Sequence, residues 1–301
     1  MTENSDESQV QAIQYLLKSF AFDGDVRNVR FIAEGWDNRV YALGDDVLLR
    51  VAKNDDASSQ LLREAAVLRR IVPLLTLPVP LPEYVHEPTP EVPLAAMAYR
   101  RVPGKSLDAD DVEDKGASAL APELARFLNR LHAIPLEVVG DLGIASFTSG
   151  RWLAHHSELV DFTRDLIRQR LHPETFACFE RWWGAYRHDP VAVDFTPRFI
   201  HGDLGCEHVL VERHPWRVTG AMDFGDAMIA DPALDLAGFP DELAAEVIRR
   251  MHPAEGERRI WSRRDAYRRI APLHAIQVGL QRRDSALLDE GIDGLEQRFC
   301  P

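Results

Sequence analysis

Short β-prone runs of apolar and polar residues recur along the first hundred positions of the chain. Residues 29–33, 38–43 and 46–51 are β-prone runs, separated by the turn sequences GWD at 35–37 and GDD at 44–46. Short runs joined by tight turns predict consecutive antiparallel strands. Residues 94–102 predict another strand. The seven prolines between residues 73 and 93 favour extended edge strands and turns over a helix.

Apolar residues at three- and four-residue spacing predict helices elsewhere. One helix is expected over residues 8–20 and another over 57–72, with Ser58 or Ser59 as its N-cap and Pro73 ending it. Beyond residue 101 helical patterns dominate, and only one block with short strands, 198–225, interrupts them. These patterns cover residues 117–133, 150–170, 174–187, 241–251 and 262–298. The sequence therefore predicts an α+β fold with a small β-rich N-terminal lobe, 1–101, and a larger helical C-terminal lobe, 102–301.

Composition and charge narrow the function classes. The 301 residues are 46% hydrophobic, enough for a sizeable core without disulfides or metals. The net charge of −13 argues against nucleic acid as a partner and favours a cationic ligand. Cys178, Cys206 and Cys300 are widely spaced and predict free thiols. The polar N-terminus lacks the features of a secretory signal, and no apolar run is long enough for a membrane helix. We therefore expect a cytoplasmic protein with no membrane partner, and a monomer by default.

Two polar sequences at the ends of apolar runs carry the chemistry. Residues 201–211 (HGDLGCEHVLV) follow one apolar run, and Asp223-Phe224-Gly225 follows another. Phosphoryl transfer needs a carboxylate that orients the attacking hydroxyl, together with ligands that hold magnesium across the phosphates. The five-residue step from Asp203 to His208 has the spacing of base and metal ligand in kinase catalytic loops. Each sequence alone is also compatible with a capped loop or a turn, but their order and spacing together favour the phosphoryl-transfer interpretation.

Residues 201–211 and 222–237 (MDFGDAMIADPALDLA) resemble the aminoglycoside phosphotransferase family, a branch of the protein-kinase-like fold. The resemblance extends from about residue 27 to about residue 240 and implies a bilobal kinase-like fold. It implies that Asp203 is the catalytic carboxylate and that His208 and Asp223 are the Mg²⁺ ligands, with ATP or GTP as phosphoryl donor. Most of the family has asparagine where this chain has His208, so an imidazole nitrogen replaces an amide oxygen there.

The same resemblance assigns roles in the N-terminal lobe. Residues 31–43 (FIAEGWDNRVYAL) look like the loop that covers the nucleotide, with Gly35 near the phosphates. Strand alternation between residues 47 and 53 allows only one of two cations to face the cleft. We assign Arg50 as the phosphate anchor, because it lies between apolar residues, and expect Lys53 to be solvated. Glu64 is the expected ion-pair partner of Arg50, although an exposed helix-face glutamate is the alternative.

The adenine pocket is assigned to the strand over residues 94–102. Met97 takes the position that guards the pocket, and the carbonyl of Ala98 and the amide of Arg100 are expected to contact the base. Asp231 and Asp235, which follow the second polar sequence, are expected to brace the catalytic loop, as such aspartates do in the resembled family; a role as substrate carboxylates is the alternative. The histidines without a ligand spacing are expected to be structural or solvent-facing, namely His132, His155, His156, His172 and His188. Three tryptophans on helical patterns are expected to be core residues rather than a ligand cage, namely Trp152, Trp182 and Trp183.

The acceptor is a small molecule with a hydroxyl group, expected to be cationic and to bind the C-terminal lobe. His208 together with residues 223–232 most resembles the aminoglycoside 2''-phosphotransferases. Macrolide phosphotransferases share the histidine and come second. A metabolic kinase acting on choline, homoserine, a thiosugar or a fructosamine stays open. A nucleotide-binding pseudokinase is disfavoured, because Asp203, His208 and Asp223 are all present.

Overall fold

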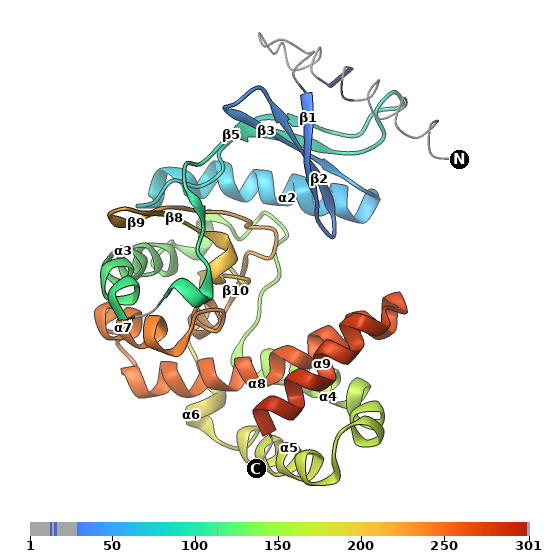
Figure 1. Cartoon of the computed structure of the whole chain (residues 1–301), viewed down its shortest axis with the longest axis vertical. Helices are drawn as coiled ribbons and strands as arrows, with labels where there is room; N and C mark the ends of the chain where they lie inside the picture. Colours follow the sequence, from blue (N-terminus) through green and yellow to red (C-terminus); the bar gives the residue numbers. More distant parts are fainter. Residues whose placement is uncertain (1–12, 14, 17–28, 113, 300–301) are drawn as a thin grey trace. The chain divides into compact units, whose positions relative to one another are not determined.

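The computed structural model describes residues 13, 15, 16, 29–112 and 114–299 (Figure 1). The chain forms two compact units. Unit 1 contains residues 1–106, 134–144 and 208–227, and unit 2 contains residues 107–133, 145–207 and 228–301. The helix predicted over residues 8–20 lies outside the described residues apart from three positions, and the lobe division at residue 101 stays a prediction.

A five-stranded antiparallel sheet is the centre of unit 1. Its strands are β1 (Val29–Glu34), β2 (Asn38–Leu43), β3 (Val47–Ala52), β4 (Pro82–His86) and β5 (Ala96–Arg100). The order is β1-β2-β3-β5-β4, so the proline-rich segment supplies an edge strand, as predicted. Consecutive strands joined by tight turns form the β1–β2–β3 half, which confirms the hairpins predicted from the alternating runs.

Helix α2 (Asp55–Ile71) covers one face of this sheet. Its N-cap is Asn54, whose side chain accepts a hydrogen bond from the backbone N–H of Ala57. The predicted cap at Ser58 or Ser59 is therefore wrong: the Ser58 hydroxyl instead donates to the Asn54 carbonyl inside the helix. Leu61 packs against the sheet in an apolar cluster, and burial of such a side chain contributes about 1.5–3 kcal/mol.

A second sheet in unit 1 carries the second polar sequence. It is built from β6 (Lys105–Ser106), β8 (Val209–Arg213) and β9 (Trp216–Ala221) in the order β6-β8-β9. The Ala221 amide at the end of β9 donates to the Pro78 carbonyl, which ties this sheet to the segment before β4. Asp223 follows two residues after the end of β9.

Helices make up most of unit 2. They are α3 (Asp114–His132), α4 (Ser149–Arg170), α5 (Pro173–Tyr186), α6 (Pro190–Val193), α7 (Asp241–Met251), α8 (Glu257–Arg282) and α9 (Ser285–Phe299). The pattern over 262–298 is thus two helices. Arg283 adopts a left-handed conformation that ends α8, and the Asp284 side chain accepts from the amides of Ala286 and Leu287 to begin α9. Strands β7 (Arg198–Ile200) and β10 (Met228–Ala230) form a small antiparallel pair.

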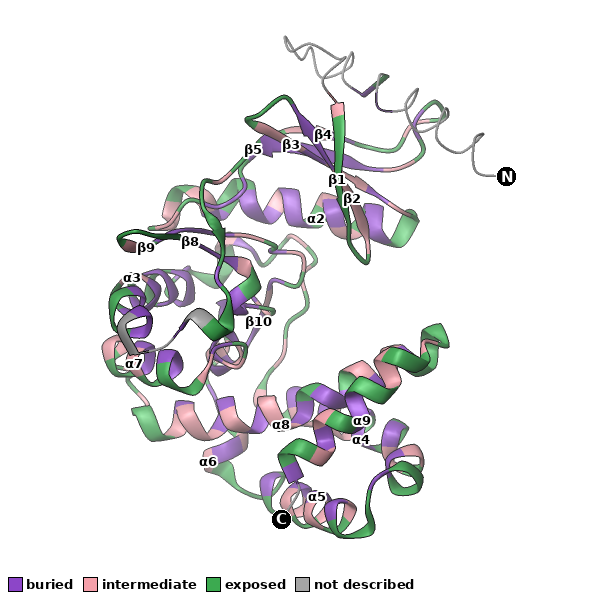
Figure 2. Cartoon of the chain, viewed as in Figure 1, coloured by how far each residue is buried: buried purple, intermediate pink, exposed green. Residues whose placement is uncertain are grey.

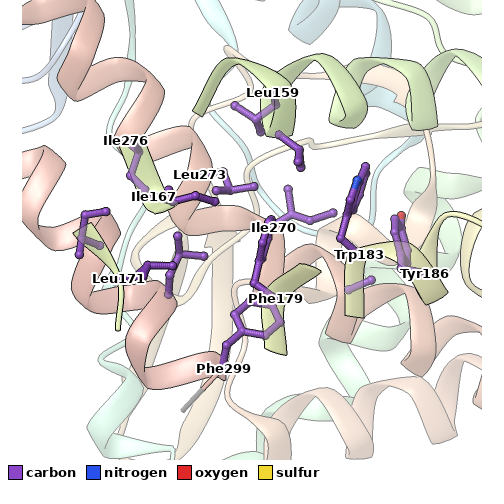
Figure 3. Packing of buried hydrophobic residues seen from close by; sticks show 14 of the residues in the cluster. Leu159, Ile167, Leu171, Phe179, Trp183, Tyr186, Ile270, Leu273, Ile276 and Phe299 are labelled. Atoms are coloured by element: carbon purple, nitrogen blue, oxygen red, sulfur yellow. The ribbon is translucent and has the colours of Figure 1, made fainter. Parts of the chain in front are cut away.

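The core of the helical part lies between α4, α5, α8 and α9 (Figure 3). Phe179, Trp183, Ile270 and Leu273 are buried there, and the Phe179 and Phe299 rings meet edge to face at 5.4 Å. Buried and exposed residues alternate along these helices with helical periodicity (Figure 2). Trp183 is therefore a core residue, as predicted, whereas Trp182 is only partly buried at the edge of the same cluster.

Two of the three cysteines that were predicted to be free thiols lie in the described part of the chain. Cys178 is partly buried, Cys206 is buried, and both are free thiols. Cys300 lies outside the described residues. In the part of the chain that the structure describes, no helix combines the length and apolar character needed to span a membrane.

Candidate functional site

The loop after β7 presents the Asp203 carboxylate in unit 2. Strand β7 pairs with β10 and is buried at Phe199 and Ile200, so the loop begins at a fixed point. Gly202 has a φ of 89°, a left-handed conformation that favours glycine. His201 is fully buried, and its ring accepts a hydrogen bond from the Asp203 amide at 3.4 Å. Asp203 itself is exposed.

A buried carboxylate holds this loop in place. Asp235, in the 3-10 helix Pro232–Leu236, accepts from the backbone amides of His201 and Gly202 at 3.0 and 2.9 Å. His132 at the end of α3 contacts the same carboxylate at 2.9 Å. Burial alone would raise the pKa of Asp235, but these hydrogen bonds and the nearby histidines hold it below its ordinary value. Asp235 therefore braces the loop that carries Asp203, as expected, and His132 is a partner that spacing alone did not indicate.

We predict that Asp235→Ala lowers the free energy of unfolding by about 3–5 kcal/mol, because it leaves buried donors without an acceptor. The exposed pair of Arg170 and Asp289 offers a matched control, and Asp289→Ala should cost less than about 1 kcal/mol. Chemical denaturation of the three proteins measures both effects. Equal losses in the two variants would contradict the bracing role.

The same carboxylate predicts how stability depends on pH. The pKa of Asp235 is lower in the folded protein than in the unfolded chain. Its contribution is therefore present above the unfolded value of about 3.9, and is lost as the pH falls through the folded value. The gap in stability between wild type and Asp235→Ala should narrow over that acidic range.

A second buried carboxylate links β10 to α8. Asp231 accepts from Arg263 Nε at 2.6 Å and from the Tyr267 hydroxyl at 2.5 Å. Arg263 also donates to Glu255 through both terminal nitrogens, at 2.7 and 2.6 Å. Asp231, Arg263 and Tyr267 are buried, so this network fixes helix α8 against the end of β10. No sequence pattern indicated Arg263, because one more arginine in an Arg-rich helix is usually interpreted as a solvated surface charge.

In unit 1 the structure brings Arg50, Glu64 and Asp223 together. Arg50 Nη1 lies 2.7 Å from Glu64 Oε1, and Arg50 Nη2 lies 3.6 Å from Asp223 Oδ1. Burial opposes the charge on Arg50, but the Glu64 and Asp223 carboxylates and the Tyr99 hydroxyl outweigh it and raise the pKa of the guanidinium. Arg50 shares its face of β3 with Leu48 and Ala52, which pack toward α2. The permanently charged guanidinium of Arg50 is thus held beside Asp223, in the second polar sequence.

Lys53, the other cation of this segment, serves a different part of unit 1. Its ammonium group donates to the Gly35 carbonyl at 3.2 Å and lies 2.7 Å from Glu34. The Gly35 amide donates to the Asn38 carbonyl at 2.9 Å, which closes the turn between β1 and β2. Lys53 therefore ties the end of β3 to this turn.

Asp223 and His208 lie close enough to face one cation. His208 Nε2 is 3.7 Å from Asp223 Oδ2, and the Asp223 side chain is 49% exposed. Asp223 has a φ of 66°, a left-handed conformation that aspartate tolerates better than most residues. Gly225 lies against Gln60 and Glu64, where a side chain would crowd helix α2.

The donor set fits Mg²⁺ when phosphate oxygens and water complete it. Mg²⁺ is usually held by one or two carboxylates, with substrate phosphates and waters as its other ligands. Asp223 supplies the carboxylate and His208 a nitrogen donor. Across the described ranges no group of three or more His, Cys, Asp or Glu side chains converges on a metal position. The protein therefore offers a partial ligand set, of the kind that a metal–nucleotide complex completes.

The residues assigned to the adenine pocket lie on β5. Met97 is buried and pairs in register with Arg50 on β3. Ala98 lies inside the sheet between Leu49 and Tyr84, whereas Arg100 is exposed at the end of the strand and lies 3.0 Å from Glu83. Their contacts with a nucleotide stay a prediction.

Comparisons with known proteins agree with this arrangement. Residues 28–273 match the sequence model of the phosphotransferase enzyme family. Viomycin phosphotransferase from Streptomyces vinaceus is 28% identical over 294 residues, covering 93% of this chain and 96% of the relative. The GDP and kanamycin complex of APH(2'')-IIIa superposes with a TM-score of 0.84 at 24% identity, over 95% of this chain and 97% of that chain. Macrolide 2'-phosphotransferase MphH from Brachybacterium faecium gives a TM-score of 0.74 at 22% identity, over 94% and 97%. The predicted α+β kinase-like fold is confirmed.

Proposed function

Since the chain belongs to the phosphotransferase enzyme family, we propose that it transfers the γ-phosphoryl group of ATP or GTP to a hydroxyl of an aminoglycoside-type antibiotic. Members of the family are kinases that phosphorylate hydroxyl groups, and the protein is an enzyme of this class. One observation carries the proposal. The exposed Asp203 carboxylate sits on a loop held by the buried Asp235.

Asp203 is the proposed catalytic carboxylate. It orients the acceptor hydroxyl and takes up its proton as the bond to phosphorus forms. Phosphoryl transfer depends mainly on positioning and on stabilisation of charge, so a fixed loop matters more than strong basicity. The bonds from Asp235 to the amides of His201 and Gly202 supply that rigidity without using Asp203 itself.

Arg50, Asp223 and His208 are the proposed nucleotide and metal residues. When bound, Mg²⁺ neutralises charge on the phosphate oxygens, and Asp223 and His208 would hold it. Arg50 is proposed to donate to the α- and β-phosphates, with Glu64 fixing the guanidinium at 2.7 Å. Gly35 in the β1–β2 turn is proposed to lie over the phosphates, and Met97, Ala98 and Arg100 to form the adenine pocket.

The choice of an aminoglycoside as the proposed acceptor is supported by the net charge of the chain and by the proteins to which the chain is similar. A net charge of −13 attracts a polycationic acceptor. A structural neighbour was solved with kanamycin and GDP. A viomycin-type acceptor is the second candidate, because the viomycin phosphotransferase is similar over nearly the whole length of both chains.

The proposal is tested by measuring release of nucleoside diphosphate from ATP and from GTP in parallel. Kanamycin, streptomycin, viomycin, a macrolide and choline serve as acceptors, with Asp203→Asn as the inactive control. Acceleration by an aminoglycoside that requires Asp203 and Mg²⁺ is the expected result. Acceleration by choline or a macrolide alone would refute the aminoglycoside acceptor and keep the phosphotransferase mechanism.

Arg50 and Lys53 are expected to differ sharply. Arg50→Ala should raise the KM for the nucleotide at least about tenfold, because a charge-assisted hydrogen bond is worth about 1.5–3 kcal/mol. Lys53→Ala removes a cation bonded to Gly35 and Glu34, and should change this KM much less. Steady-state kinetics with varied nucleotide measure both values. A larger effect at Lys53 would overturn the assignment of Arg50.

A further inference from the structure

Six aromatic and imidazole rings gather between α4 and α8 in unit 2. We call Phe147, Trp152, His155, His156, Tyr267 and His274 the ring cluster. His274 is exposed and stacks on the partly buried His155 at 6.2 Å, and His155 stacks on the buried Trp152 at 5.6 Å. His156 meets the Trp152 ring edge to face at 4.8 Å. The stack therefore extends from the exposed ring of His274 to the buried pair of rings, Trp152 and His156.

The buried pair carries two polar atoms without a partner. Trp152 is 7% exposed and His156 is 2% exposed. Trp152 Nε1 and His156 Nδ1 have no hydrogen-bond partner among the described residues. An indole N–H can only donate, and an unpaired buried polar group costs about 1–3 kcal/mol. Burial, with smaller contributions from His274 and His155, holds the pKa of His156 well below its ordinary value, so its ring is neutral and one of its nitrogens is an acceptor.

The ring cluster lies close to the catalytic loop within unit 2. The Phe147 amide donates to the Ile229 carbonyl on β10 at 2.8 Å, and Ile229 pairs with Phe199 on β7. Strand β7 leads directly into the loop that carries Asp203. Two strand spacings, about 10 Å, therefore separate the backbone of the cluster from β7. Tyr267 belongs to the cluster and bonds Asp231 at the end of β10.

The α8 residues of the ring cluster lie on the face of the helix that binds Asp231. Arg263, Tyr267 and His274 are separated by four and seven residues, so they share one face of the helix. Arg263 and Tyr267 on that face bind Asp231. A cavity of about 530 Å³ between α5, α6 and α8 is lined instead by residues such as Ser262 and Asp265 on the opposite face. The ring cluster, and not this cavity, therefore lies on the face of α8 that binds Asp231.

The ring cluster offers apolar ring faces to a ligand. None of its six rings carries a negative charge at neutral pH, and the Asp231 carboxylate behind Tyr267 is already paired with Arg263. The Arg151 guanidinium lies 5.8 Å from the centre of the Phe147 ring. A ring of the acceptor can stack its apolar face on His155 and His274.

We propose that the ring cluster binds a hydroxyl-bearing ring of the acceptor, with one hydroxyl accepting from Trp152 Nε1 and donating to His156 Nδ1. A hydroxyl donates and accepts at once, so a single group has the chemistry that both buried atoms need, and the two rings that carry them meet at 4.8 Å. His155 lies between this pair and the surface, and its side chain rotates to admit the hydroxyl. Such side-chain changes are common on binding. The identity of the ligand as the acceptor rests on the proposed function.

Trp152→Phe tests the proposal, because it keeps a ring and deletes only the indole N–H. It should raise the KM for the acceptor about 3- to 10-fold, the loss of one neutral hydrogen bond, and should not raise the KM for the nucleotide. His274→Ala removes an exposed ring without touching the core and should act in the same direction. Trp183→Phe is the matched control, since it removes an indole from the helical core outside the ring cluster. Melting temperatures identify any loss of folding.

A second measurement separates this proposal from the proposed function. The indole ¹H–¹⁵N signal of Trp152, assigned by its absence in Trp152→Phe, is followed while kanamycin, streptomycin, viomycin and a macrolide are added to nucleotide-bound protein. A shift without turnover would support the ring cluster and refute the proposed transfer. Turnover with an unchanged signal and an unchanged acceptor KM in the folded variants would show that the cluster is a structural core. Absence of any shift across the panel would overturn the proposal as well.

Discussion

Asp203→Asn is expected to lower kcat by about 10²- to 10⁴-fold, the usual contribution of a positioned general base. The asparagine keeps the shape of the side chain and removes its capacity to take a proton. Because Asp203 is exposed, stability should change by no more than about 0.5 kcal/mol. The initial rate of acceptor-dependent diphosphate release measures the first effect, and thermal unfolding measures the second.

Glu207→Gln is the matched control for Asp203→Asn. Glu207 is another exposed carboxylate in the same loop, four residues further along. Neutralising it tests whether the loss of any negative charge in this loop is enough to stop turnover. Wild-type turnover in Asp203→Asn, or equal losses in both variants, would remove Asp203 from the catalytic role.

Much of the fold follows from local pattern. Strands β1, β2 and β3 were predicted nearly to the residue, because each is short, alternates and ends at a tight turn. The break between α8 and α9 was not predicted. Arg283 takes a left-handed conformation there, and the sequence lacks the glycine that normally marks such a helix end. The N-cap of α2 was misplaced because Asn54, Ser58 and Ser59 are all good caps in sequence, and only the folded chain shows which side chain accepts.

Some residues of the candidate site could likewise be predicted from the sequence, and others could not. Asp203, His208 and Asp223 stand out because phosphoryl transfer imposes their order and spacing. The bond between His132 and Asp235 joins residues 103 positions apart, and no local pattern indicates it. The ring cluster likewise joins α4 to α8. Trp152 was interpreted as a core residue, and burial supports that interpretation, but burial alone does not reveal an unpartnered N–H.

Asp223→Asn is expected to weaken Mg²⁺-dependent nucleotide binding more than about 100-fold. Loss of groups that only orient a metal ligand costs about 10- to 100-fold in metal affinity, and a direct carboxylate ligand should exceed that. Asparagine is the right replacement, because the left-handed backbone at φ 66° is tolerated by Asn but strained for alanine. Titration calorimetry with ATP and with GTP, at fixed Mg²⁺ and with EDTA, measures the difference.

His208→Asn is the comparison variant for Asp223→Asn. It installs the amide oxygen that most of the resembled family has at this position, and it keeps the neighbour of Asp223 polar. Mg²⁺-dependent binding should survive in His208→Asn and be lost in Asp223→Asn, because the carboxylate supplies the charge that a hard cation requires. Retained binding in Asp223→Asn would leave the carboxylate as no more than the counter-charge of Arg50, 3.6 Å away, and the metal would have to be held by other groups.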